Sequence, residues 1–105
     1  ITNQGYTDLV MDAARSSGAG GGTIIHAKGT GVKEASHFMG VSLAAEKEIV
    51  LIVAKSAEKN AIMKAIMAEA GPDTKAKAIV FSLPVSETAG MRLLEAEDPD
   101  TTDAT

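Results

Sequence analysis

Residues 48–54, with the sequence EIVLIVA, constrain the fold of this 105-residue chain more than any other stretch. Their six consecutive apolar residues, most of them β-branched, predict a strand. Because successive side chains of a strand point to opposite faces, both faces of the sheet carry large apolar groups here. The two helices that a chain of this size offers can cover only one face. We therefore expect a second copy of the chain to cover the other, in a symmetric homo-oligomer.

A glycine-rich turn at residues 18–22 precedes a second predicted strand, residues 23–28. The four glycines of the turn allow an abrupt reversal, and the β-branched residues after it favour a strand. Gly29, Thr30 and Gly31 close this strand. Glycines at such a strand end let the backbone approach a ligand and offer N–H groups to an anion. The alternative is that the glycines serve turn geometry only.

Two helices are predicted, one before and one after these two strands in the sequence. Thr7 is expected to cap the first, which Gly18 ends, and Ser56 to cap the second, which Gly71 and Pro72 end. The predicted buried positions are Leu9, Val10, Ala13, Ala14 and Ser17 in the first helix, and Ala57, Ala61, Ile62, Ala65, Ile66 and Ala70, widened by Met63 and Met67, in the second.

The remaining elements complete an α+β order. Residues 78–83 predict a last strand, which Pro84 ends, and residues 1–3 resemble the end of a first strand that begins upstream. The order strand, helix, strand, strand, helix, strand is that of a ferredoxin-like split βαβ sandwich (βαββαβ). Residues 30–46 have no settled period, so we expect a functional loop there. A strand at residues 41–43 is the alternative.

Composition narrows the class of protein. Five of the fourteen acidic residues fall in residues 95–105, which we expect to be an acidic disordered tail after a single domain at residues 1–94. The domain lacks the basic stripe with aromatic residues that nucleic-acid binding requires. It has no cysteine, no apolar run of the roughly 18 to 20 residues that span a bilayer and no secretory signal. We expect a cytoplasmic protein without membrane insertion.

Catalysis and metal binding have little support in the sequence. It contains no nucleophile elbow and no Walker-type lysine loop, so we expect no enzyme. His26 and His37, with Glu34, are the candidate metal ligands. Two histidines eleven residues apart, without cysteine, are not a typical metal motif, and we expect no metal site. Instead, His26 is expected on a sheet face and His37 on the loop surface.

Glu46 and Glu48 share one face of a strand by period two, and Lys47 lies on the other face. Two neighbouring carboxylates could act as an acid–base pair. We expect both to be exposed charges at a strand end instead.

The order and spacing of several segments resemble the nitrogen regulatory P-II family, and in particular its shorter P-II-like members. The resemblance covers residues 1–93. It implies the ferredoxin-like fold in a homotrimer that binds adenine nucleotides, such as ATP, ADP or AMP, as effectors in clefts between subunits. It also implies signal transduction, in which the loop after the second strand touches a target enzyme, transporter or regulator. The matching segments are Asp8 with the helix after it and residues 21–31 (GGTIIHAKGTG), 46–53 (EKEIVLIV), 62–71 (IMKAIMAEAG) and 81–85 (FSLPV).

The same resemblance implies a set of ligand-binding residues. The strand-end glycines match the family's glycine pair, whose backbone lies beside the nucleotide. The lysines before the last predicted strand lie where the family places residues around the phosphates. The C-terminal arginine matches a family arginine that reaches into the cleft of the neighbouring subunit. Basic side chains around a glycine-lined backbone suit a phosphate or carboxylate, although surface lysines are the alternative. The predicted ligand-binding residues are Gly29, Thr30, Gly31, Lys33, Lys75, Lys77 and Arg92.

The sequence also departs from the family pattern. Residues 74–78, TKAKA, lack the glycine-flanked lysine of the nucleotide binders, and Gly90 stands where the family has a second arginine. The loop after the second strand contains no tyrosine, so uridylylation has no acceptor there. Two alternatives therefore stay open, namely a trimeric interaction module that binds no nucleotide, and a metal-binding trimer whose metal response His26→Ala would abolish.

Overall fold

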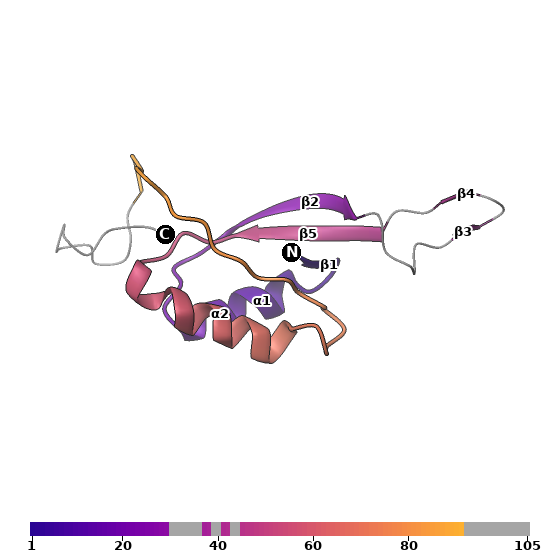
Figure 1. The fold of residues 1–105 in the computed structure, drawn as a ribbon, viewed down its shortest axis with the longest axis horizontal. Helices are drawn as coiled ribbons and strands as arrows, with labels where there is room; N and C mark the ends of the chain where they lie inside the picture. The colour runs from indigo at the N-terminus through magenta and orange to yellow at the C-terminus, as the bar shows by residue number, and fades with distance from the viewer. Residues whose placement is uncertain (30–36, 39–40, 43–44, 92–105) are drawn as a thin grey trace.

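The computed structural model describes residues 1–29, 37–38, 41–42 and 45–91 (Figure 1). Within these ranges the chain forms two helices and a three-stranded sheet, and a separate short hairpin lies in the loop after the second strand. The elements are β1 (Thr2–Asn3), α1 (Thr7–Ser16), β2 (Thr23–Gly29), β3 (His37–Phe38), β4 (Val41–Ser42), β5 (Ala45–Leu51) and α2 (Ser56–Ala70).

The sheet is antiparallel and has the strand order β1-β5-β2. β2 and β5 pair along their whole length, from Thr23 opposite Leu51 to Gly29 opposite Ala45. The strand predicted at residues 23–28 is therefore confirmed. The strand predicted at residues 48–54 is also present, but it begins earlier and ends earlier, at Leu51. Its end is set by its partner, because β2 begins at Thr23 and offers no residue opposite positions 52–54.

The loop predicted at residues 30–46 lies mostly outside the described residues. Its described part contains β3 and β4, which pair with each other, and the start of β5 at Ala45. The alternative of a strand at residues 41–43 is thus present in part, as the two residues of β4.

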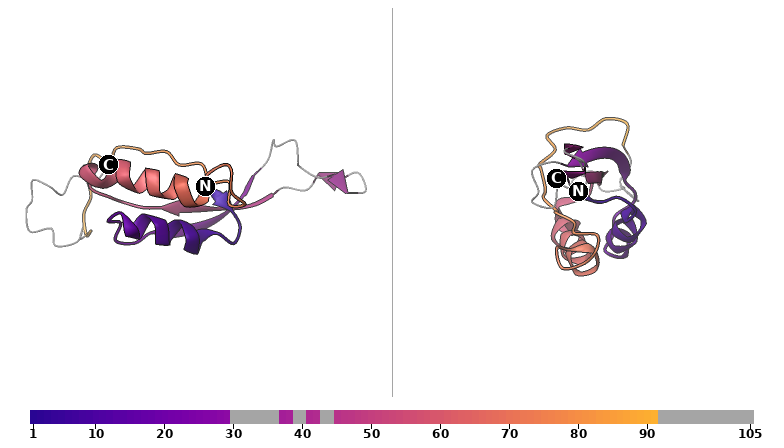
Figure 2. Two further views of the ribbon diagram at one scale, coloured as in Figure 1. Left: turned by 90° about the horizontal axis from the view of Figure 1, so that it is seen from below. Right: turned by 90° about the vertical axis from the view of Figure 1, so that its right-hand side faces the viewer.

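Both helices lie on one side of the sheet (Figure 2). Val10, Ala13 and Ala14 of α1 and Ile62 and Ile66 of α2 form the centre of the core. Val50 and Ile52 pack against this core, so the even-numbered positions from Glu48 onward face the helices. The expectation that two helices cover a single face is confirmed. Neither helix of the described part of the chain is long and apolar enough to cross a membrane.

The helix starts differ from the prediction by one residue. Tyr6 and Lys55 occupy the N-cap positions without a side-chain capping bond, and Thr7 and Ser56 are the first helical residues. Each first turn closes on the backbone instead, because Val10 N donates to the Tyr6 carbonyl at 3.1 Å and Glu58 N to the Lys55 carbonyl at 2.9 Å.

The buried face of α2 is narrower than predicted. Ile62, Ile66 and Ala70 are buried, which follows the spacing of four residues that keeps side chains on one stripe of a helix. Met67 is 42% exposed, and the alanines at 57 and 61 are exposed as well. α2 therefore contacts the core through a single stripe.

The glycine-rich turn between α1 and β2 requires glycine at two positions, for two different reasons. Gly18 follows α1 with φ of 111°, a conformation that side chains other than glycine rarely adopt. At Gly22 a Cβ atom would lie 2.8 Å from the sulfur of Met11 and 3.2 Å from the Leu51 carbonyl oxygen. The turn therefore needs glycine for backbone conformation at one end and for close packing at the other.

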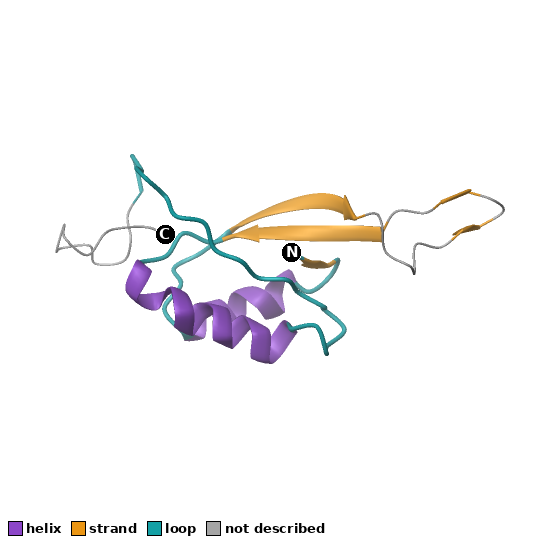
Figure 3. Ribbon diagram, viewed as in Figure 1, coloured by secondary structure: helices purple, strands orange, loops and turns teal. Residues whose placement is uncertain are grey.

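Residues 78–83 do not form the predicted strand, and this prediction was wrong. Ile79 exchanges two backbone hydrogen bonds with Ile1, each 2.9 Å long, and the next bond, from Asn3 N to the Ala76 carbonyl, is shifted by one residue from the regular register. Lys77, with φ of 48°, interrupts a regular ladder. The segment runs past β1 as a loop (Figure 3). The fold is thus compatible with the ferredoxin-like arrangement, with three of its four strands formed.

Candidate functional site

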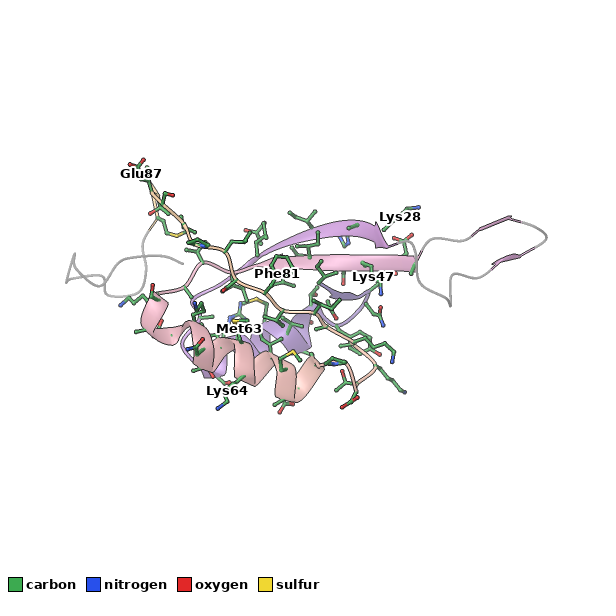
Figure 4. The ribbon with its side chains drawn as sticks, in the orientation of Figure 1. Lys28, Lys47, Met63, Lys64, Phe81 and Glu87 are labelled. Atoms are coloured by element: carbon green, nitrogen blue, oxygen red, sulfur yellow. The ribbon has the colours of Figure 1, made fainter. Side chains whose placement is uncertain are left out.

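The end of the sheet from which the loop after β2 departs carries the described part of the predicted site. Gly29 is the last residue of β2 and lies opposite Ala45 at the start of β5. The preceding pair is Lys28 opposite Glu46, and Lys47 lies opposite Ala27. Figure 4 shows Lys28 and Lys47 together at this end. Four of the predicted ligand-binding residues, Thr30, Gly31, Lys33 and Arg92, lie outside the described residues.

Lys47 lies directly over Gly29. A Cβ atom on Gly29 would be 3.0 Å from Cε and 3.1 Å from Cγ of Lys47, so the lysine stem occupies the space that the glycine leaves. The Lys47 ammonium donates a hydrogen bond of 2.6 Å to Oδ1 of Asn3 in β1. Neither Lys47 nor Asn3 is among the ligand-binding residues predicted from the sequence. The sequence indicated only that Lys47 lies on the opposite strand face from Glu46 and Glu48, because side chains alternate along a strand.

The segment with Lys75 and Lys77 is bound to the same end of the sheet. Asn3 Nδ2 donates to the Lys75 carbonyl at 2.9 Å, and Asn3 N donates to the Ala76 carbonyl at 2.9 Å. The hydroxyl of Thr2, which is buried, also donates to the Ala76 carbonyl, at 3.0 Å. The structure thus brings Lys75 and Gly29 to one sheet end through Asn3 and Lys47.

Three backbone N–H groups of residues 74–78 are used internally. Thr74 N donates to the Gly71 carbonyl at 3.0 Å, Lys77 N to the Thr74 carbonyl at 3.2 Å, and Ala78 N to the Ala70 carbonyl at 2.8 Å. These three groups are therefore not free to bind a phosphate. The exposed side chains of Lys75 and Lys77 remain as positive groups.

The helix-facing side of the same strands holds a buried carboxylate. Glu48 is 7% exposed, and its Oε1 accepts a hydrogen bond of 3.0 Å from Gly5 N. Its Oε2 lies 3.0 Å from Nδ1 of His26, whose side chain is 74% exposed. The expectation that Glu48 is an exposed charge was wrong, because it pairs with β1 and faces the turn into α1. Glu46, which is half exposed, lies 3.6 Å from Lys28 as a surface ion pair.

His26 lies on a sheet face as expected, on the side that carries the helices. His37 belongs to β3, but its side chain and Glu34 lie outside the described residues. In the part of the chain that the structure describes, no group of three or more potential ligands could hold a metal ion.

Replacing Glu48 by alanine is expected to lower the free energy of unfolding by about 1–3 kcal/mol, because Gly5 and His26 lose a buried, charged acceptor. Urea denaturation measures this change. Glu46→Ala is the matched control on the same strand face, and its exposed ion pair should contribute less than about 1 kcal/mol. Equal losses in the two variants would contradict the structural role assigned to Glu48.

The other face of the sheet has no helix and exposes large apolar side chains. Ile25 and Leu51 are 43% and 52% exposed, and Phe81 and Leu83 are 62% and 68% exposed. Leu51 and Phe81 also line a groove of about 360 Å³ at the sheet edge, between β5, residues 78–85 and helix residues such as Val10 and Ile66. The sheet is thus apolar on both faces, as residues 48–54 predicted.

The glycine-rich turn lies at the opposite end of β2 from Gly29. It lines a second cavity of about 360 Å³ together with Lys55, Glu58 and Met91. The structure therefore separates this turn from Gly29 by the length of β2, and of the two only Gly29 belongs to the candidate site.

The fold defines a small α+β protein with helices on one sheet face and an open apolar face. The family model for Nitrogen regulatory protein P-II matches residues 1–95, and the chain belongs to the nitrogen regulatory protein P-II family. The resemblance drawn from the sequence is confirmed. Members of this family are regulatory signal-transduction proteins, not enzymes, which form oligomers and interact with target proteins. No curated protein and no solved structure matches the chain.

Proposed function

We propose that the protein is a homotrimeric P-II-type signalling protein. It binds a small anionic ligand, an adenine nucleotide, in the clefts between subunits, and it regulates a target protein through the loop after β2. Family membership supports the signalling role in nitrogen regulation. We assign this role to residues 1–94, with residues 95–105 as an acidic tail.

The observation that carries this proposal is the open face of the sheet. Burial of apolar surface contributes roughly 25 cal/mol for each Å², so an exposed face of this kind favours association. Ile25 of β2 pairs with Ile49, so it lies on the same open face as Leu51 of β5, and Phe81 of residues 78–85 lines one groove with Leu51. Symmetric copies of the chain are the simplest cover for such a surface.

Association through this face would place the ligand between subunits. Lys47 is on the same strand face as Leu51, at the end where β5 begins. A copy that covers Leu51 would therefore approach the sheet end with Gly29, Lys47 and Lys75 as well. An anion bound there would contact both subunits.

The same position supports control of the loop by the ligand. Gly29 and Ala45 are paired at the base of the loop, where the chain leaves β2 and returns to β5. A ligand against Gly29 can therefore favour one arrangement of the loop over another, which is the requirement for regulating a target.

A trimeric interaction module that binds no nucleotide is the second candidate function. The internal use of the N–H groups of Thr74, Lys77 and Ala78 favours it, because the backbone of this segment then offers little to a phosphate. This agrees with the missing glycine-flanked lysine in residues 74–78.

Light scattering on the purified chain, followed by titration calorimetry with ATP, ADP and AMP, tests the proposal. We expect three times the monomer mass and heat with at least one nucleotide. Ligand at 100 times its Kd should also stabilise the protein by about 2.7 kcal/mol. If the trimer shows neither binding heat nor a thermal shift at millimolar nucleotide, only the interaction module remains as a candidate function. A stable monomer would overturn both candidates.

A further inference from the structure

We infer that Lys47 is an anion-binding residue of the candidate site and that Asn3 is the residue that positions it. This inference rests on the proposed function, because it names the group that receives the negative charge of the ligand. Lys47 has its stem over Gly29 and its ammonium 2.6 Å from Oδ1 of Asn3.

Among the described residues, no carboxylate forms an ion pair with Lys47. Its ammonium donates to the neutral amide of Asn3, and Lys28 on the neighbouring strand pairs with Glu46 instead. An ammonium group has three donors, and one hydrogen bond to Asn3 leaves two. Lys47 is thus a half-buried cation that is held in position and still has donors to offer.

Asn3 connects this cation to the segment with Lys75. Its side chain accepts from Lys47 and donates to the Lys75 carbonyl at 2.9 Å, while its backbone N–H binds the Ala76 carbonyl. The amide therefore fixes the distance between β5 and the segment. Holding Lys47 before the ligand arrives reduces the conformational entropy that binding must otherwise cost.

The location favours an anion over other ligands. The N–H groups of Thr74, Lys77 and Ala78 are already bonded, so positive side chains must supply most of the attraction for a phosphate. Lys47 lies on the open sheet face, which the proposed trimer would shield from water. A shielded charge without a counter-charge is costly, and the phosphate groups of a nucleotide would provide that counter-charge.

The test compares Lys47→Met with Lys28→Met, using ATP and titration calorimetry. Both variants remove one lysine charge from the same sheet end. Charge-assisted hydrogen bonds contribute about 1.5–3 kcal/mol, so Lys47→Met should weaken ATP binding about 10-fold to 100-fold. Lys28→Met should change the Kd less than about threefold, because this side chain is 70% exposed and ion-paired.

A second pair of measurements separates charge from structure. Asn3→Asp keeps an oxygen for the Lys47 ammonium but adds a counter-charge, so we expect it to weaken ATP binding as well. Lys47→Met should also reduce the dependence of the Kd on salt, since one charge contact is lost. Lys47→Gln, which keeps an N–H donor, replaces Lys47→Met if that variant does not fold, and the same loss of affinity is expected.

The outcomes distinguish the inference from the proposed function. If the wild-type trimer gives no heat with ATP, ADP or AMP, both are overturned. If the wild-type protein binds ATP and Lys47→Met binds it equally well, or if Lys28→Met loses as much, the inference alone is overturned.

Discussion

Replacing Leu51 by glutamate is expected to yield a folded monomer. Leu51 is 52% exposed on the open sheet face, so the substitution places no charge in the core of the subunit. In the proposed trimer, however, every subunit would bury an unpaired carboxylate. Burial of such a charge costs several kcal/mol, and symmetry repeats the cost in each copy. Light scattering would report the mass, and circular dichroism would report the retained fold.

Met67→Glu is the matched control for this prediction. Met67 is also a large apolar residue, 42% exposed, but it lies on α2 and not on the sheet. We expect this variant to keep the mass of the wild-type oligomer. If Leu51→Glu kept that mass too, the open face would not be the subunit interface, and the clefts proposed beside it would have no basis.

Replacing Ile66 by alanine is expected to lower the free energy of unfolding by about 2–5 kcal/mol, the range for truncation of a large buried side chain. Ile66 is 4% exposed and lies in the core between α2 and α1. The loss combines the lost burial of its methyl groups with the cavity that remains. Denaturation in urea at equal protein concentrations measures it, since association makes stability depend on concentration.

Met67→Ala is the control for this second prediction. It truncates the next residue of the same helix, so differences in helix propensity are small, but its side chain is exposed. Surface substitutions of this kind usually change stability by about 0.5 kcal/mol or less. If Met67→Ala lowered the free energy of unfolding as much as Ile66→Ala, the outer side of α2 would be buried too. That result would contradict the finding that α2 contacts the core through one stripe of side chains.

The sequence alone determined four of the elements, β2, β5 and the two helices, and the α+β class. The apolar run at residues 48–54, the glycine-rich turn and the helix end at Gly71 each act over a few residues, through side-chain alternation, backbone freedom and capping. Such signals predicted β2, β5 and both helices, with ends displaced by up to three residues. They also predicted that the sheet is apolar on two faces, because alternation along one strand needs no knowledge of its partners.

Only the tertiary structure decided which side chains meet at the candidate site. Lys47 contacts Asn3 across 44 positions of sequence, and Asn3 contacts Lys75 across 72. The burial of Glu48 and the loss of a strand at residues 78–83 likewise depend on how far β1 pairs with its neighbours. These outcomes are set by strand register, and no local property of the residues encodes the register between segments so far apart in the chain.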